Sequence, residues 1–203
     1  MQQPISAVFP LVLGSASPRR REILSNLGIA ILVLPADIVE TVRAGEQPLP
    51  YIERIAFEKL AGVAERARDE ARAGLLVADT IVVVDGEILG KPTDVADAER
   101  LLHKLCGREH TVYTRYAIAF PDGTPFVART VESAVRLRAA TSAEITGYAR
   151  TGEGLDKAGA YAIQGIGAFL VESISGSYTN VVGLPACEVV RDLSAAGLLT
   201  GFP

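Results

Sequence analysis

The stretch LLVADTIVVV, from Leu75 to Val84, constrains the fold more than any other part of the chain. Successive side chains of a strand point to opposite faces, and here both faces are apolar. A strand that is buried on both faces lies in the middle of a sheet that is covered on both sides. Asp79 is the one charged residue in this apolar run. A buried carboxylate without a partner would cost several kcal/mol or lose its charge.

The rest of the chain alternates between helical and strand-like patterns. Strands are predicted at 11–14, 29–34, 75–89 (with a turn at Asp85-Gly86) and 168–174, and two long alternating runs around 121–125 predict a hairpin. Helices are predicted at 18–27, about 50–72, 94–105, 141–150 and 185–196, with a loop at 176–184. This order predicts an α/β fold with a mixed, twisted sheet.

Composition excludes several classes of protein. The chain has 203 residues, of which 49% are hydrophobic, so it can bury the core of one domain or of two small lobes. Its net charge is −4 and no apolar run is long enough for a membrane span, so we expect no binding to nucleic acid or membranes. The N-terminus lacks the charge pattern of a signal peptide. The chain has two cysteines, Cys106 and Cys187, which are far apart in the sequence, and this fits a reducing cytoplasm.

Three arginines stand where a helix should begin, in LVLGSASPRRREIL. Ser17 and Pro18 suit the N-cap and first helical positions, so Arg19, Arg20 and Arg21 occupy the first turn. Each cation there is disfavoured by roughly 0.3–1 kcal/mol. A bound anion would remove the conflict, and spacing places Arg20 on the apolar face and Arg21 away from it. The sequence therefore predicts a phosphate site, with a solvated basic turn as the alternative.

Lys59 and Asp79 both interrupt apolar patterns. Lys59 lies in the apolar stripe of the long helix, which comprises Ile52, Ile55, Ala56, Leu60 and Val63. A buried lysine needs an anion nearby, unless its stem lets the ammonium reach water. Asp79 needs a cation, which can be an arginine, a lysine or a metal, and it could also form a purely structural ion pair.

Glycine-rich segments supply the remaining signals. Lys91 lies between Gly90 and Pro92 on a tight loop, and this pattern by itself is more typical of a lysine in a solvated turn. DKAGAYAIQG and GSYTNVVGLP mix glycines with polar side chains, as is typical of segments that approach a ligand closely. Because no pair of nucleophile and base is evident, the residues point to hydrolysis of a phosphorylated ligand by activated water.

Four motifs together resemble the Maf family of nucleoside triphosphate pyrophosphatases. They are SASPRRREIL, VADTIVVVDGEILGKP, DKAGAYAIQG and SGSYTNVVGLP, in this order. The resemblance implies one Maf-like domain over 1–203, with two lobes around a central cleft, similar to inosine triphosphate pyrophosphatases. It also implies release of pyrophosphate from dTTP or UTP by attack of water on the α-phosphorus, a divalent cation (Mg²⁺, Mn²⁺ or Co²⁺), a cytoplasmic location and a homodimer.

The resemblance also implies roles for individual residues. Asp79 is the expected proton acceptor, Glu40 and Asp79 the metal ligands, and Lys59 and Lys91 further catalytic groups. The expected substrate contacts are Ser15, Ser17, Arg19, Arg20, Thr80, Gln164 and Asn180. Among these, Arg19, Thr80 and Gln164 have the form of the subfamily that prefers dTTP and UTP.

Three residues depart from the family pattern. Ala186 and Cys187 stand where bulkier apolar residues are usual, and Gly154 stands where proline is common.

A nucleotide-sensing regulator linked to septum formation is the alternative function. A third function, binding of nucleic acid, is disfavoured by the acidic charge balance.

Overall fold

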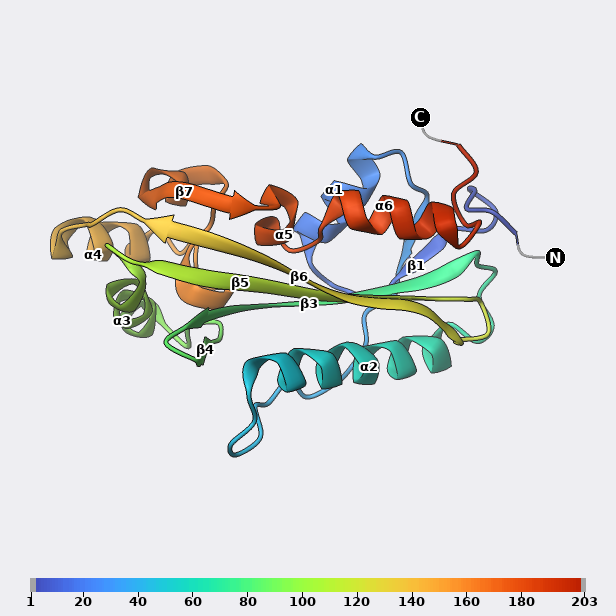
Figure 1. Ribbon diagram of the computed structural model, residues 1–203, viewed down its shortest axis with the longest axis horizontal. Helices are drawn as coiled ribbons and strands as arrows, with labels where there is room; N and C mark the ends of the chain where they lie inside the picture. The colour runs from blue at the N-terminus through green and yellow to red at the C-terminus, as the bar shows by residue number, and fades with distance from the viewer. Residues whose placement is uncertain (1–2, 202–203) are drawn as a thin grey trace. The chain divides into compact units, whose positions relative to one another are not determined.

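The computed structural model describes residues 3–201 (Figure 1). The strands are β1 (Leu11–Leu13), β2 (Ile31–Val33), β3 (Gly74–Val84), β4 (Glu87–Leu89), β5 (Glu109–Ala119), β6 (Pro125–Leu137) and β7 (Val171–Gly176). The helices are α1 (Pro18–Asn26), α2 (Pro48–Arg66), α3 (Val95–Leu105), α4 (Ser142–Arg150), α5 (Tyr178–Val182) and α6 (Ala186–Ala195), with 3₁₀ segments η1 (Ala158–Ala160) and η2 (Gly165–Leu170).

The described strands form one mixed sheet, as the sequence predicts. Its order is β2-β1-β3-β5-β6-β7, with β4 paired to β3. β1 runs parallel to β2 and β3, whereas β4 is antiparallel to β3 and β7 is antiparallel to β6. β3 therefore has a neighbour on each side, which confirms that LLVADTIVVV is a central strand.

The chain divides into two compact units. The first unit contains residues 3–79, 114–130 and 183–201 of the described chain, and the second contains 80–113 and 131–182. The boundary falls within β3, directly after Asp79. The cleft between two lobes stays a prediction.

In the first unit, helices cover both faces of the sheet. α2 lies on one face, and α1 and α6 lie on the other (Figure 1). Leu60 and Val63 of α2 belong to one buried cluster with Val77 of β3. On the opposite face, the hydroxyl of Tyr116 in β5 donates to Asp192 of α6 over 2.6 Å. This cover explains why β3 is apolar on both faces.

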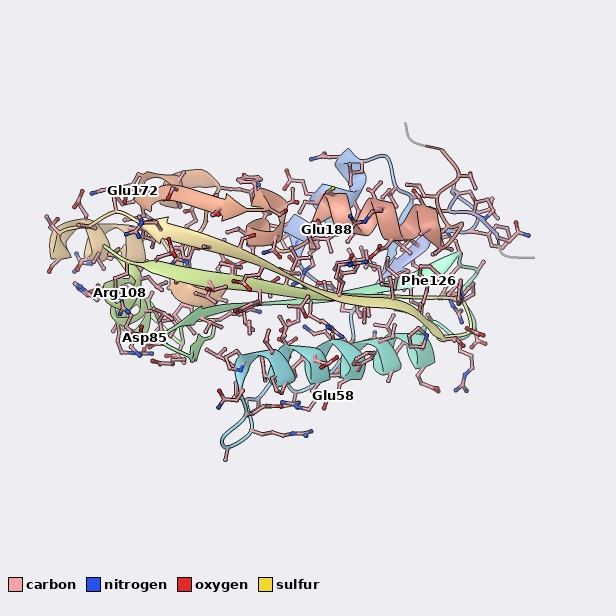
Figure 2. The ribbon with its side chains drawn as sticks, viewed as in Figure 1. Glu58, Asp85, Arg108, Phe126, Glu172 and Glu188 are labelled. Atoms are coloured by element: carbon pink, nitrogen blue, oxygen red, sulfur yellow. The ribbon has the colours of Figure 1, made fainter. Side chains whose placement is uncertain are left out.

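In the second unit, α3 and α4 contact each other, and η1 packs against α3. Their apolar faces enclose a core with parts of β3, β5 and β6. At the turn after β3, the carboxylate of Asp85 accepts two hydrogen bonds of 2.7 Å from Arg108 (Figure 2). Asp85 therefore has a partner in addition to its turn role.

Three boundaries differ from the sequence prediction. α2 ends at Arg66 rather than near 72, because Arg72 folds back and donates to the carbonyls of Ala67 and Glu70. The strand predicted at 168–174 begins at Val171, and the loop predicted at 176–184 contains the short helix α5.

Within the described residues, none of the helices has the length and apolar content that a bilayer span requires.

Candidate active site

A lysine between two carboxylates forms the centre of the candidate site. The Nζ atom of Lys59 lies 2.7 Å from Oδ1 of Asp79 and 2.8 Å from Oε1 of Glu40. Lys59 and Asp79 are each 7% exposed, whereas the Glu40 side chain is 42% exposed. We call these three residues the carboxylate–lysine centre; all of them belong to the first unit.

This geometry decides between the alternatives that the sequence leaves open for Lys59. Its ammonium is buried and paired, so it does not extend past its neighbours into water. The cation that Asp79 requires is this lysine. α2 places Lys59 against β3 because its apolar stripe packs on that face of the sheet, as the cluster around Leu60 and Val63 shows.

Arg20 points inward, as its helical spacing predicts. Its Nη1 donates to the Ser15 hydroxyl over 2.9 Å and to the Ala78 carbonyl over 2.8 Å, and its Nε donates to the Gly183 carbonyl over 2.7 Å. Burial lowers the pKa of this guanidinium, while the charges of Asp79 and Glu40 act in the opposite direction. Arg20 thus joins α1 to the residue before Asp79 and to the loop before α6.

The first turn of α1 keeps the features of an anion site. Ser17 is at the N-cap position and Pro18 opens the helix, but within the described residues the Ser17 side chain makes no capping hydrogen bond. The first turn contains no acidic residue. Arg19 is partly exposed and Arg21 is exposed, so Arg21 points away from the core as predicted. The backbone N–H groups of this turn remain suited to an anion.

The two carboxylates of the centre also fit a divalent cation. Oxygen ligands suit Mg²⁺ and Mn²⁺, and Mg²⁺ is commonly held by one or two carboxylates together with substrate phosphates. Among residues 3–201, no three His, Cys, Asp or Glu side chains converge as a metal cage. Glu40 and Asp79 are therefore the residues that would hold such an ion, with phosphate oxygens and water completing its ligands.

Tyr51 is a neighbour of the centre that the sequence analysis missed. It is 6% exposed, and its hydroxyl lies 3.4 Å from the Glu40 carbonyl. Burial, together with the charges of Asp79 and Glu40, raises the pKa of Tyr51 to about 12, so it is a hydrogen-bond donor at neutral pH. It precedes Lys59 by eight residues on α2, a helical spacing that could have revealed it.

The loop that bears Glu40 is held by a second ion-pair group on α2. Arg54 donates to both Glu46 oxygens over 2.7 Å and to the Thr41 carbonyl over 3.0 Å. The side chains of Arg54 and Glu46 are 16% and 10% exposed. This contact fixes the backbone next to Glu40. No sequence pattern predicts it, because Glu46 lies in an irregular loop.

The other expected site residues belong to the second unit. Lys91 is exposed, and a 3.1 Å hydrogen bond from Gly159 N to Gly90 O connects its loop to the DKAGAYAIQG segment.

Three further expected substrate contacts also lie in the second unit. Gln164 is exposed and Thr80 is partly buried. Asn180 is fully buried, and its amide donates to Val112 O and Ser133 Oγ. Asn180 therefore holds α5 to the strands, and its contact with substrate stays a prediction.

A scan against family models matches residues 10–196 to the family described as Maf-like protein. The chain belongs to this family. Several curated Maf-like relatives are similar over most of their length. A protein named dTTP/UTP pyrophosphatase from Geobacter metallireducens is 51% identical over 93% of this chain and 97% of its own. Proteins of the same name from Citrifermentans bemidjiense and Shewanella oneidensis are 48% and 45% identical, each over 93% of this chain and over 96% and 99% of their own.

One solved structure shows a slight likeness to this Maf-like chain. It is a nucleoside-triphosphatase, dITP/XTP pyrophosphatase, from Mycobacterium abscessus, with 15% identity and a TM-score of 0.39 over 64% of this chain and 74% of that chain.

The departures from the Maf-like pattern now have a structural setting. A Cβ at Gly154 would lie 2.0 Å from the Ala160 carbonyl oxygen, so this loop approaches closer than any side chain permits. Cys187 is exposed in the first turn of α6, and Ala186 begins that helix. Nothing in the structure explains the choice of Ala186 and Cys187.

Proposed function

We propose that this chain is a nucleoside triphosphate pyrophosphatase that hydrolyses dTTP and UTP to the nucleoside monophosphate and pyrophosphate. The observation that carries the proposal is the buried Lys59 shared by Glu40 and Asp79, beside the Arg20 turn. Buried ionisable groups of this kind are commonly found where chemistry occurs. The names and high coverage of the Maf-like relatives support the choice of substrate.

Asp79 is the proposed proton acceptor for the attacking water. Lys59 contacts its Oδ1 atom, so Oδ2 is the oxygen that we assign to the water. Glu40 is the proposed partner of Asp79 in holding a divalent cation, which when bound would polarise phosphate oxygens and offset their charge. The proposed ions are Mg²⁺, Mn²⁺ and Co²⁺.

The arginine turn is the proposed phosphate site. The backbone N–H groups at the start of α1 and the cation of Arg19 would meet the triphosphate, with Ser15 and Ser17 contributing hydroxyls. Arg20 donates to the Ser15 hydroxyl and to the carbonyls of Ala78 and Gly183, so its main contribution is to hold this turn in place. Lys91 is proposed as a further cation that offsets developing charge.

Base choice is assigned to Arg19, Thr80 and Gln164. The support is the pyrimidine-type form of these positions and the names of the relatives. The acidic charge balance supports the proposal that nucleic acid is not a partner. A cytoplasmic location, the absence of a membrane partner and a homodimer remain proposals that come from the resemblance and the composition.

The test is to incubate the purified protein with dTTP and each divalent cation, and to identify both products. We expect dTMP with pyrophosphate, and no activity after chelation of the metal. A panel with UTP, dCTP, GTP and 7-methyl-GTP measures base choice, for which we expect dTTP and UTP to be preferred. Formation of dTDP with orthophosphate, or faster hydrolysis of 7-methyl-GTP, would contradict the proposal.

A further inference from the structure

The partly buried carboxylate of Glu153 holds the segment that bears Gln164. Residues 162–167, which we call the Gln164 loop, run from just after η1 into the first half of η2 in the second unit. Two backbone N–H groups after Gln164 donate to one carboxylate: Ile166 N lies 2.8 Å from Oε1 of Glu153, and Gly167 N lies 2.7 Å from Oε2. Glu153 is thus bidentate toward the C-terminal side of the loop.

Tyr148 holds the other side of the same loop. Its hydroxyl accepts a 3.0 Å hydrogen bond from Ala162 N and donates a 2.9 Å hydrogen bond to Oε2 of Glu153. Tyr148 is 3% exposed and packs in the core of the second unit, on α4. Backbone N–H groups on both sides of Gln164 are therefore held by one connected pair, Tyr148 and Glu153.

The backbone of the loop passes too close to its neighbours to carry a side chain at Gly165 or Gly167. A Cβ at Gly165 would lie 2.2 Å from Oε1 of Glu153, and Gly165 has a φ of 68°. A Cβ at Gly167 would lie 2.4 Å from the Ala162 carbonyl. Glycine at these positions is what lets the backbone reach the carboxylate.

Glu153 is charged when it makes these contacts. Burial acts to raise the pKa of Glu153, but the N–H groups of Gly167 and Ile166, the Tyr148 hydroxyl and the charge of Lys157 hold it below its ordinary value. Hydrogen bonds to a charged acceptor are about twice as strong as neutral ones. The Gln164 side chain between these fixed points stays exposed, so the fixed backbone serves a side chain that faces outward.

We propose that Glu153, acting with Tyr148, is a positioning residue for base recognition, because it fixes the backbone on both sides of Gln164. A glutamine amide distinguishes one base edge from another only if its oxygen and nitrogen are held in register with that edge. This inference rests on the proposed function, since Gln164 reads a base only if the substrate is a nucleotide.

The experiment compares four single variants, Tyr148→Phe, Glu153→Gln, Glu153→Ala and Thr146→Val, with the parent protein. Tyr148→Phe removes the hydroxyl, and Glu153→Gln leaves one of the two N–H groups facing an amide NH₂. The matched control is Thr146→Val, which removes a hydroxyl from the same helix, where Thr146 donates to Glu99 over 3.1 Å and not to the loop. For each protein we measure kcat and KM with dTTP and dCTP, the inhibition constant of inorganic tripolyphosphate, and Tm.

We expect Glu153→Gln and Tyr148→Phe to lower the ratio of kcat/KM for dTTP over dCTP by about tenfold, mainly through KM. Tripolyphosphate has no base, so its inhibition constant should stay within about twofold of the parent's value. Thr146→Val should leave the ratio unchanged. A Glu153→Ala variant should lose more discrimination than Glu153→Gln, because it removes both acceptors.

Each other result overturns the inference in a distinct way. If the parent hydrolyses dTTP but both variants keep its base discrimination, Glu153 is not a positioning residue and the proposed function stands. If tripolyphosphate inhibition weakens as much as dTTP binding, the variants disturb the whole site and the specific role is wrong. If the parent hydrolyses no nucleoside triphosphate, the proposed function fails and the inference fails with it.

Discussion

The variant Asp79→Asn separates catalysis from stability at the carboxylate–lysine centre. It keeps the size of the side chain and an oxygen that can accept from Lys59, but it removes the negative charge and the ability to take a proton. We expect turnover of dTTP to fall by roughly 10²–10⁴-fold, the usual contribution of one acid–base group. That fall corresponds to about 2.7–5.5 kcal/mol in the activation barrier.

The effect on folding should be much smaller. Asp79 is 7% exposed and its oxygen lies 2.7 Å from Lys59, so a charge-assisted hydrogen bond becomes a neutral one, at a cost of about 1–2 kcal/mol. A neutral amide is less costly to bury than a carboxylate, and Lys59 keeps Glu40 at 2.8 Å. We therefore expect Tm to fall by no more than about 8 °C.

The assay measures dTTP turnover, dTTP affinity and Tm on the same preparation, with Glu40→Gln as the matched control. Glu40 contacts the same ammonium but is half-exposed, so its loss should act mainly on the metal concentration needed for activity. Turnover of Asp79→Asn within about threefold of the parent would exclude Asp79 as the base. Lost activity together with a collapsed Tm would instead support a purely structural ion pair.

Three further predictions address the surroundings of the centre. Arg20→Ala should weaken dTTP binding more than Arg21→Ala does. It should also lower the free energy of unfolding by roughly 2–4 kcal/mol, because three buried acceptors lose their donor. If isothermal titration and urea denaturation give the same losses for both variants, this prediction is wrong. Burial lowers the pKa of His110 to about 4, and the unfolded state binds a proton near pH 6.5, so stability should fall as pH drops through that window. The loss should be about 2 kcal/mol from about pH 7 to about pH 5, and His110→Gln should flatten the urea midpoint against pH; an unchanged slope would refute the assignment. Gly154→Ala should lower the free energy of unfolding by about 1–3 kcal/mol, because its Cβ would overlap a backbone carbonyl, whereas Gly147→Ala, which meets nothing within 4 Å, should be neutral or stabilising; similar Tm values for the two would show that the loop adapts freely.

The sequence by itself determined the features that depend on periodicity and on the cost of burial. The apolar residues on both faces of β3 predicted a central strand, and helical spacing predicted that Arg20 points inward; the structure confirms both. The same cost showed that Lys59 and Asp79 each needed a partner. These inferences are local, because each follows from a residue and its neighbours within one strand or helix.

Only the tertiary structure decided which residues are the partners of Lys59 and Asp79. Lys59 and Asp79 are twenty residues apart, and they meet because α2 packs on the face of β3 to which Asp79 points. The segment after α2 also depends on a distant contact, since Arg72 donates both to the carbonyl of the C-cap residue Ala67 and to the carbonyl of Pro121. A pattern of apolar residues states that a face will be buried, but which side chains meet there depends on how separate segments pack.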